Sequence, residues 1–160
     1  MDSTNDGMMN AYKWRLDNQE GIKSHEEMIE ILEQTLAKHP GTKFIACHLA
    51  NCSYDLDKAA ELLDSFPNLY MDISARYAEF CATPRRSRAF MINNQDRLLY
   101  GTDMGRSESM YQITFRLLES ADEHIYSDHF SYHWPLHALD LPVEVLEKIY
   151  RLNAESFLSR

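Results

Sequence analysis

Two apolar runs in this chain lead into side chains that can bind a metal or move a proton. His48 directly follows the run Lys43–Cys47, and Asp103 follows the run Arg97–Tyr100 after one Gly-Thr step. Imidazole and carboxylate groups are ligands for divalent metals and also transfer protons in catalysis. Enzymes with parallel sheets hold their reacting groups at the carboxyl ends of the strands. His48 and Asp103 are therefore candidate catalytic residues, and Asp103 is also a candidate metal ligand.

Each of these residues also has a purely structural interpretation. Asp103 lies in Gly-Thr-Asp-Met-Gly, and aspartate is common in such turns because its side chain bonds the nearby backbone. A single histidine at the end of a strand is more often a hydrogen-bonded structural residue than a catalytic one. The presence of a partner at a second strand end favours the catalytic interpretation of His48.

Arg76 follows the middle apolar run, Leu69–Ile73, and has two interpretations of similar weight. Its guanidinium can bind a substrate carboxylate through two parallel hydrogen bonds. It can equally pair with Asp72 or Glu79 and hold the loop. Cys47 is expected in the core, because side chains alternate along a strand and His48 takes the opposite side.

A loop rich in aromatic residues contains four histidines, namely His124, His129, His133 and His137. Their four-residue spacings fit a metal site on a helix. Pro135 interrupts any helix there. We therefore expect an amphipathic loop packed over the rim of the sheet, with its polar side chains toward solvent.

Helices and strands alternate along the chain, which predicts crossover units and a parallel sheet. Strands are expected at Lys43–Cys47, Leu69–Ile73 and Arg97–Tyr100. Helices are expected near Ser24–Lys38, Asp55–Phe66, from Thr83 onward, Ser109–Leu118 and Val143–Leu152, followed by a turn at Ala154–Leu158. Ser24 and Glu27 form a capping-box pattern, and Thr83 precedes a proline as a helix cap would.

Length and composition narrow the class of protein. The chain has 160 residues, a formal net charge of −9 and a sequence pI of about 5.2. One domain with a buried core fits this length, and the acidic balance argues against a nucleic-acid partner. The odd count of three cysteines suits a reducing compartment. No membrane span or signal peptide is recognisable, so we expect no membrane partner and a cytoplasmic location.

Four segments together resemble the amidohydrolase-related family of metal-dependent hydrolases, whose members are (β/α)8 TIM barrels. They are HPGTKFIACHLAN, LLDSFPNLYMDISARYAEF, DRLLYGTDMG and LDLPVEVLEKIYRLNAESFL, in the family's order and spacing. The resemblance implies an α/β fold that is the last three βα units of such a barrel. Residues 24–160 would then be the carboxyl-terminal half of the barrel domain, and residues 1–23 an irregular segment.

The resemblance also implies roles for individual residues. His48 matches the catalytic histidine of the sixth strand, and Asp103 matches the aspartate of the eighth strand, a metal ligand or proton acceptor. The implied cofactor is a divalent metal, in the first place Zn, and the implied reaction is hydrolysis of a C–N or C–O bond in a small-molecule substrate. The family's His-x-His ligand pair has no match in the sequence. Ala50 stands where family members often have glycine.

The missing ligand pair leaves the function open in three ways. The chain is a metal-dependent hydrolase that is inactive as a fragment, a non-oxidative decarboxylase of the same family, or a non-catalytic remnant or interaction module. A small doubly wound domain is a further fold alternative, although no glycine-rich phosphate loop supports it. Strands without barrel neighbours predict self-association, pairing with a missing amino-terminal half, or marginal stability. The segment around Tyr12 and Trp14 is expected to cover one such edge.

Overall fold

A three-stranded parallel sheet forms the centre of the protein. The computed structural model describes residues 21–130, 132 and 134–159. The strands are β1 (Phe44–Ala46), β2 (Leu69–Asp72) and β3 (Leu98–Leu99), in the order β1-β2-β3. Both neighbouring pairs are parallel, which confirms the predicted strands and their order. The structure thus has a mixed α/β fold.

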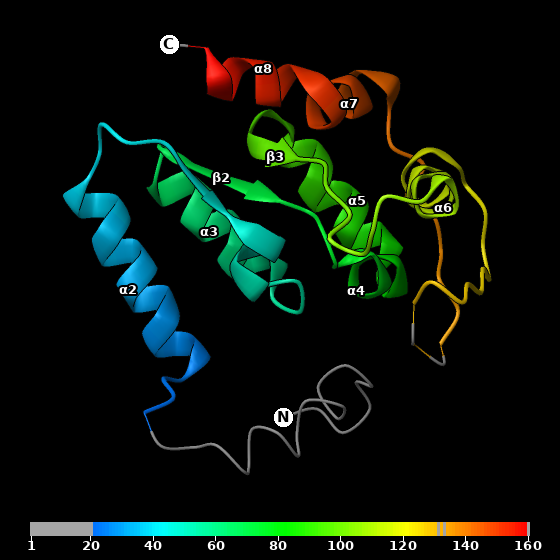
Figure 1. Ribbon diagram of the computed structural model, residues 1–160, viewed down its shortest axis with the longest axis horizontal. Coiled ribbons are helices and arrows are strands. Elements are labelled where there is room, and N and C mark those ends of the chain that lie inside the picture. The colour runs from blue at the N-terminus through cyan, green and yellow to red at the C-terminus, as the bar shows by residue number, and fades with distance from the viewer. Residues whose placement is uncertain (1–20, 131, 133, 160) are drawn as a thin grey trace.

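Helices flank this sheet on several sides (Figure 1). They are α2 (His25–Lys38), α3 (Leu56–Ser65), α4 (Tyr77–Ala82), α5 (Pro84–Asn93), α6 (Glu108–Glu119), α7 (Val143–Glu147) and α8 (Asn153–Leu158). Short 3-10 helices lie at η1 (Cys47–Asn51) and η2 (Gln95–Arg97), and a π-helical turn, η3 (Lys148–Leu152), joins α7 to α8. In the view of Figure 1, α3, α4 and α5 lie behind the sheet and α7–α8 lie along its top.

The helix ends show which local signals were reliable. The capping box of α2 is confirmed, because Ser24 Oγ accepts from Glu27 N and Glu27 Oε2 accepts from Ser24 N. Thr83 is the N-cap residue of α5, as predicted, although its side chain makes no capping hydrogen bond. The proline at the first position of α5 still starts that helix. Helix α4 was not expected, because six residues are too few to show a clear period.

The two faces of the sheet differ in burial. Leu69, Met71 and Leu98 are fully buried, on the face of the sheet that α3 packs against. On the opposite face, Ile45 pairs in register with Tyr70, and Asp72 pairs with Leu99. Ile45 is 42% exposed, whereas Tyr70 is partly covered by Phe157 of α8, ring to ring at 5.1 Å. Among the described residues, this second face of the sheet is therefore only partly covered.

The carboxyl-terminal helices fasten the amino ends of the strands. Asn153, which is buried, donates from Nδ2 to the carbonyl oxygens of Gln95 (2.6 Å) and Leu98 (2.8 Å). Lys43, just before β1, donates from Nζ to the carbonyl oxygens of Ser156 and Phe157 at 3.1 Å. A cation there also suits the negative carboxyl end of a helix. The opposite ends of the strands stay clear for the loops that carry His48 and Asp103.

Some sequence predictions fall outside the described part of the chain. Tyr12 and Trp14 lie outside the described residues, and so does His133. Within the described residues, no helix is both long and apolar enough to cross a membrane.

Candidate catalytic site

Left-handed backbone marks the loops at the carboxyl ends of the three strands. His48, Leu49, Ala50 and Asn51 follow β1 with φ angles of 57°, 53°, 53° and 58°. Ala75 follows β2 with φ 54°, and Asp103 follows β3 with φ 53°. Such angles are costly for residues with a Cβ, and they cluster at functional sites where the surroundings enforce them. Among the described residues, His124 and Asp140 are the left-handed non-glycine residues outside these loops, so most of this strained backbone lies in the loops that the residue types also indicate.

The left-handed turn at His48 corrects the prediction for Cys47. Cys47 is exposed rather than buried in the core. It continues the strand alternation on the face of Ile45, toward Asp72, while the turn breaks the alternation and brings the His48 ring to the same rim. Partial burial and the Asp72 carboxylate raise the pKa of the Cys47 thiol. The thiol is therefore protonated at neutral pH.

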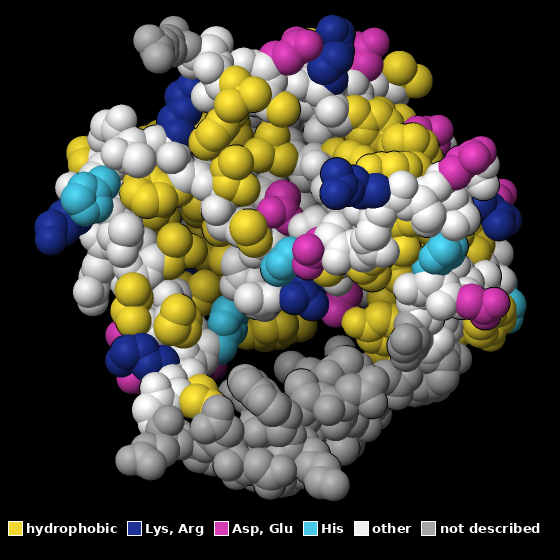
Figure 2. Space-filling model, viewed as in Figure 1, with side chains coloured by type: hydrophobic (Ala, Val, Ile, Leu, Met, Phe, Trp, Pro, Cys, Tyr) yellow, Lys and Arg dark blue, Asp and Glu magenta, His cyan; other side chains and the backbone are white. Residues whose placement is uncertain are grey.

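His48 and Asp103 lie together at the carboxyl-end rim of the sheet. His48 Nε2 is 3.4 Å from Asp103 Oδ2, although the two residues come from strand ends on either side of β2. The His48 side chain is 26% exposed and that of Asp103 is 61% exposed. Figure 2 shows histidine, acidic and basic side chains close together near the middle of this face. The geometry suits proton transfer with a small molecule that reaches the rim from solvent.

Asp72 and Ser74, at the end of β2, hold the other side of the His48 ring. Asp72 Oδ1 accepts hydrogen bonds from the backbone N–H of His48 (3.0 Å) and of Ser74 (3.0 Å), and from the Ser74 hydroxyl. His48 Nδ1 lies 2.9 Å from Ser74 Oγ and 3.1 Å from the Ser74 carbonyl oxygen. Sequence reasoning considered Asp72 only as a partner for Arg76 and did not single out Ser74. An Asp-x-Ser pattern directly after a strand is the signal that could have found both.

Gly101 keeps the loop after β3 close to Ser74. A Cβ built on Gly101 would lie 3.2 Å from Ser74 Cβ, which is tighter than ordinary van der Waals contact. The Gly101 carbonyl oxygen also accepts a 2.7 Å hydrogen bond from the buried Tyr77 hydroxyl. Close packing between neighbouring loops therefore favours glycine at this position of Gly-Thr-Asp.

Arg76 makes contacts that hold its own loop. Its Nη1 lies 3.4 Å from Glu79 Oε1, and its Nη2 donates to Asn51 Oδ1 at 2.5 Å. Glu79 Oε1 also accepts from the Tyr132 hydroxyl. Arg76 Nε and Glu79 Oε2 are buried and have no hydrogen-bond partner among the described residues. The Glu79 pairing expected from the structural interpretation is present, and a substrate-binding role for Arg76 remains a hypothesis.

The histidine-rich loop brings two of its histidines together. An isolated antiparallel bridge pairs Ile125 with Leu136. Beside it, the His124 N–H donates to His137 Nδ1 at 3.4 Å, and the two rings lie 6.5 Å apart. His129 N–H bonds Ser127 Oγ instead. Phe130 and Leu136 are buried, so the loop packs apolar side chains under a polar surface.

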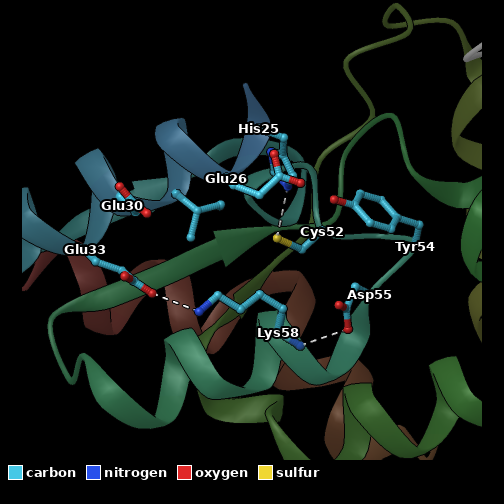
Figure 3. Close-up of a pocket in the computed structure, with 9 residues that line it drawn as sticks. His25, Glu26, Glu30, Glu33, Cys52, Tyr54, Asp55 and Lys58 are labelled. Carbon is cyan, nitrogen blue, oxygen red and sulfur yellow. Dashed lines mark hydrogen bonds and ion pairs between the residues drawn. The ribbon is translucent and has the colours of Figure 1, made fainter. Parts of the chain in front are cut away.

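A separate cavity of about 450 Å³ lies between α2 and the segment that follows η1 (Figure 3). His25, at the start of α2, places Nε2 3.7 Å from the buried Cys52 Sγ. The cation in the cavity wall, Lys58, is already paired with Glu33 at 2.9 Å and with Glu61 at 3.3 Å. Glu26, Glu30 and Asp55 add negative charge. Burial and the Asp55 charge raise the pKa of the Cys52 thiol to about 11, so the thiol beside His25 is a poor nucleophile at neutral pH. The cavity is distinct from the His48 rim.

A complete metal site is not present within residues 21–130, 132 and 134–159. No group of three or more His, Cys, Asp or Glu side chains there can hold a metal ion. His48 and Asp103 supply two donors, whereas a catalytic zinc site uses three protein ligands. The residues described therefore do not fit a metal by themselves, and the chemistry that they support directly is proton transfer.

Residues 7–160 match the model of a protein family that is described as amidohydrolase. No curated protein matches the chain, and no solved structure matches it. The match covers all four segments on which the resemblance rested, together with both His48 and Asp103.

Proposed function

Because the chain belongs to the amidohydrolase family, we propose that His48 and Asp103 are the proton-transfer pair of a hydrolase that acts on a C–N or C–O bond. The observation that carries the proposal is the 3.4 Å approach of His48 Nε2 to Asp103 Oδ2 at the rim where parallel-sheet enzymes hold their chemistry. The family is generally metal-dependent, and its substrates are small molecules. A hydrolase-like function follows from the family, whereas the bond and the residue roles belong to the proposal.

The pair has the chemistry that hydrolysis needs. Asp103 is the more exposed member and accepts a proton from the attacking water. His48 orients the substrate and returns a proton to the leaving nitrogen or oxygen. Arg76, two residues after Ser74, is proposed to bind a carboxylate of the substrate after releasing Glu79. The barrel, too, belongs to this proposal, with β1, β2 and β3 as its last three strands.

Asp103 is the one described residue to which this proposal assigns metal binding. Asp103 is proposed as one ligand of a divalent ion, with Zn²⁺ as the first candidate. Further ligands must then come from outside the described residues, because the described ones supply two donors. The same two-donor set favours a second candidate function, a non-catalytic module that pairs with another polypeptide. A decarboxylase of the same family would use the same rim.

The test is turnover by the purified chain with Zn²⁺ or Mn²⁺ against amides, esters, lactones and aryl carboxylic acids. The same assay is run on the product of any reading frame that continues upstream of Met1 and encodes His-x-His. The hydrolase proposal expects amide or ester turnover in the extended protein, lost in Asp103→Asn and kept in Asp64→Asn, an exposed aspartate on α3. Release of CO2 would identify a decarboxylase. Absence of turnover in both forms would overturn the hydrolase and favour the module.

A further inference from the structure

We propose that Ser74 is a positioning residue that fixes the tautomer of His48. In the neutral ring the proton is held on Nδ1, and the lone pair of Nε2 is presented to Asp103. The inference concerns the site of the proposed function and assigns the direction in which protons move there. Its geometry can be tested without any catalytic assay.

The contacts of Nδ1 determine where the ring proton sits. The Ser74 carbonyl oxygen, 3.1 Å from Nδ1, can only accept a hydrogen bond. The Ser74 hydroxyl, 2.9 Å from Nδ1, gives its own proton to Asp72 Oδ1 and therefore turns a lone pair toward the ring. Both neighbours of Nδ1 are thus acceptors. A ring nitrogen between two acceptors carries the proton, and the bond that it makes sets the tautomer of the other nitrogen.

Asp72 fixes the orientation of the Ser74 hydroxyl. Its Oδ1 receives the backbone N–H of His48 and the backbone N–H of Ser74, each at 3.0 Å, in addition to that hydroxyl. Ser74 is 5% exposed, so water has little access to the hydroxyl as an alternative acceptor. The carboxylate also ties the backbone of the His48 turn to the end of β2. The Asp72 carboxylate therefore holds both the backbone of His48 and the Ser74 hydroxyl that faces the His48 ring.

The opposite tautomer, with the proton on Nε2, is less favourable at the buried ring nitrogen Nδ1. With the proton on Nε2, His48 would donate toward Asp103 Oδ2 at 3.4 Å, a long hydrogen bond. Nδ1 would then turn its lone pair toward the Ser74 carbonyl oxygen, acceptor against acceptor. Asp103 is 61% exposed and can take its hydrogen bonds from water. Unsatisfied acceptors cost more when buried than when solvated, so the Nδ1–H form is favoured.

With the proton on Nδ1, Nε2 is the ring atom that accepts a proton at the rim. Neutral His48 presents an acceptor at Nε2, beside the acceptor Oδ2 of Asp103, so the pair binds a group that donates hydrogen bonds. An attacking water meets that description. When the water oxygen forms its bond to the substrate carbon, its proton goes to Asp103 Oδ2 and from there to His48 Nε2, 3.4 Å away. The leaving nitrogen or oxygen takes that proton as its bond to carbon breaks, and neutral His48 returns.

The test is long-range ¹H–¹⁵N NMR of the chain after dialysis against EDTA, at a pH where the ¹⁵N shifts show a neutral ring. His48→Asn assigns the signals. The expected spectrum has a protonated Nδ1 and an unprotonated Nε2. In Ser74→Ala the ratio of the Nδ1–H to the Nε2–H form should fall about tenfold, the equivalent of one hydrogen bond. Ser74→Thr, which restores a hydroxyl, should recover the ratio.

Ser87→Ala is the matched control for a merely structural effect. Ser87 is fully buried and its hydroxyl donates to the Phe80 carbonyl oxygen at 2.9 Å. Its loss should lower the free energy of unfolding without moving the nitrogen signals of His48. An Nε2–H form that dominates in the wild type overturns the proposal. So does a folded Ser74→Ala variant with an unchanged ratio. Absence of turnover would overturn the hydrolase and leave this tautomer result intact.

Discussion

The side-chain amide of Asn153 lies 2.8 Å from the carbonyl oxygen of Leu98, which joins the carboxyl-terminal helix to the strand that leads to Asp103. Asn153 is 5% exposed and also donates to the Gln95 carbonyl oxygen. Asn153→Ala should therefore lower the free energy of unfolding by about 2 kcal/mol, since it leaves buried acceptors unpaired. Urea denaturation measures the change. The control is Asn93→Ala on the exposed side of α5, which should change it little.

Replacing Ala50 by glycine is expected to stabilise the protein. Its φ of 53° is left-handed, a conformation that disfavours a Cβ and suits glycine. Ala50→Gly should raise the free energy of unfolding by about 1 kcal/mol. Ala60→Gly, inside α3, should lower it by a similar amount because glycine weakens a helix interior. A loss of stability in both variants would contradict the left-handed turn.

The buried Cys52 thiol is expected to make the protein less stable at alkaline pH. Burial, followed by the Asp55 charge, raises the pKa of this thiol from its ordinary value of 9.0 to about 11. The folded protein therefore favours the protonated thiol. This contribution is complete below pH 9 and is lost as the pH rises toward 11. Unfolding curves at pH 8 and 10.5 should show a smaller drop for Cys52→Ala than for the wild type, whereas Ser53→Ala should keep the full drop.

Metal binding by the chain alone should be weak. His48 and Asp103 leave most coordination positions of a Zn²⁺ ion to water. After dialysis, elemental analysis should find well under one zinc per chain, and Asp103→Asn should lower the residual amount. Retention of one equivalent would show that residues outside the described ranges complete a site in this chain.

The partly open face of the sheet predicts association of the chain with itself. Ile45, on the edge strand β1, is 42% exposed, and an apolar edge invites pairing with another strand. Light scattering should show a mass that rises with protein concentration. Ile45→Lys should reduce the rise, while Val143→Lys, which replaces an exposed residue at the start of α7, should not. A wild-type chain that stays monomeric at all concentrations would contradict this prediction.

Local signals in the sequence predicted the elements better than they predicted the side chains at their ends. The apolar runs around Ile45, Met71 and Leu98 give the three parallel strands, because a buried strand needs such a run. Ser24 and Glu27 gave the start of α2 because a capping box depends on neighbouring residues alone. Thr83 stands at the predicted N-cap position of α5, but its side chain does not cap the helix, since the short α4 runs almost directly into α5 there.

The sequence predicted only those site residues whose side-chain type and position after a strand mark them as candidates by themselves. His48 and Asp103 stood out as chemical groups after strands, and the structure brings them together. Cys47 was misplaced because alternation was extended through a turn whose left-handed backbone no local pattern announced. The contact of Ser74 with the His48 ring depends on strand register, which places the end of β2 beside the end of β1.

The Lys43 bond to the end of α8 has a practical consequence for experiments on this protein. It holds the last described residues beside the amino ends of the strands, whereas His48 and Asp103 lie at the carboxyl ends. Figure 1 shows the carboxyl terminus on the side of α8. A fluorophore, a surface tether or a fused reporter attached after Arg160 would thus sit remote from the rim. Immobilised protein should remain open to small molecules at the His48 side.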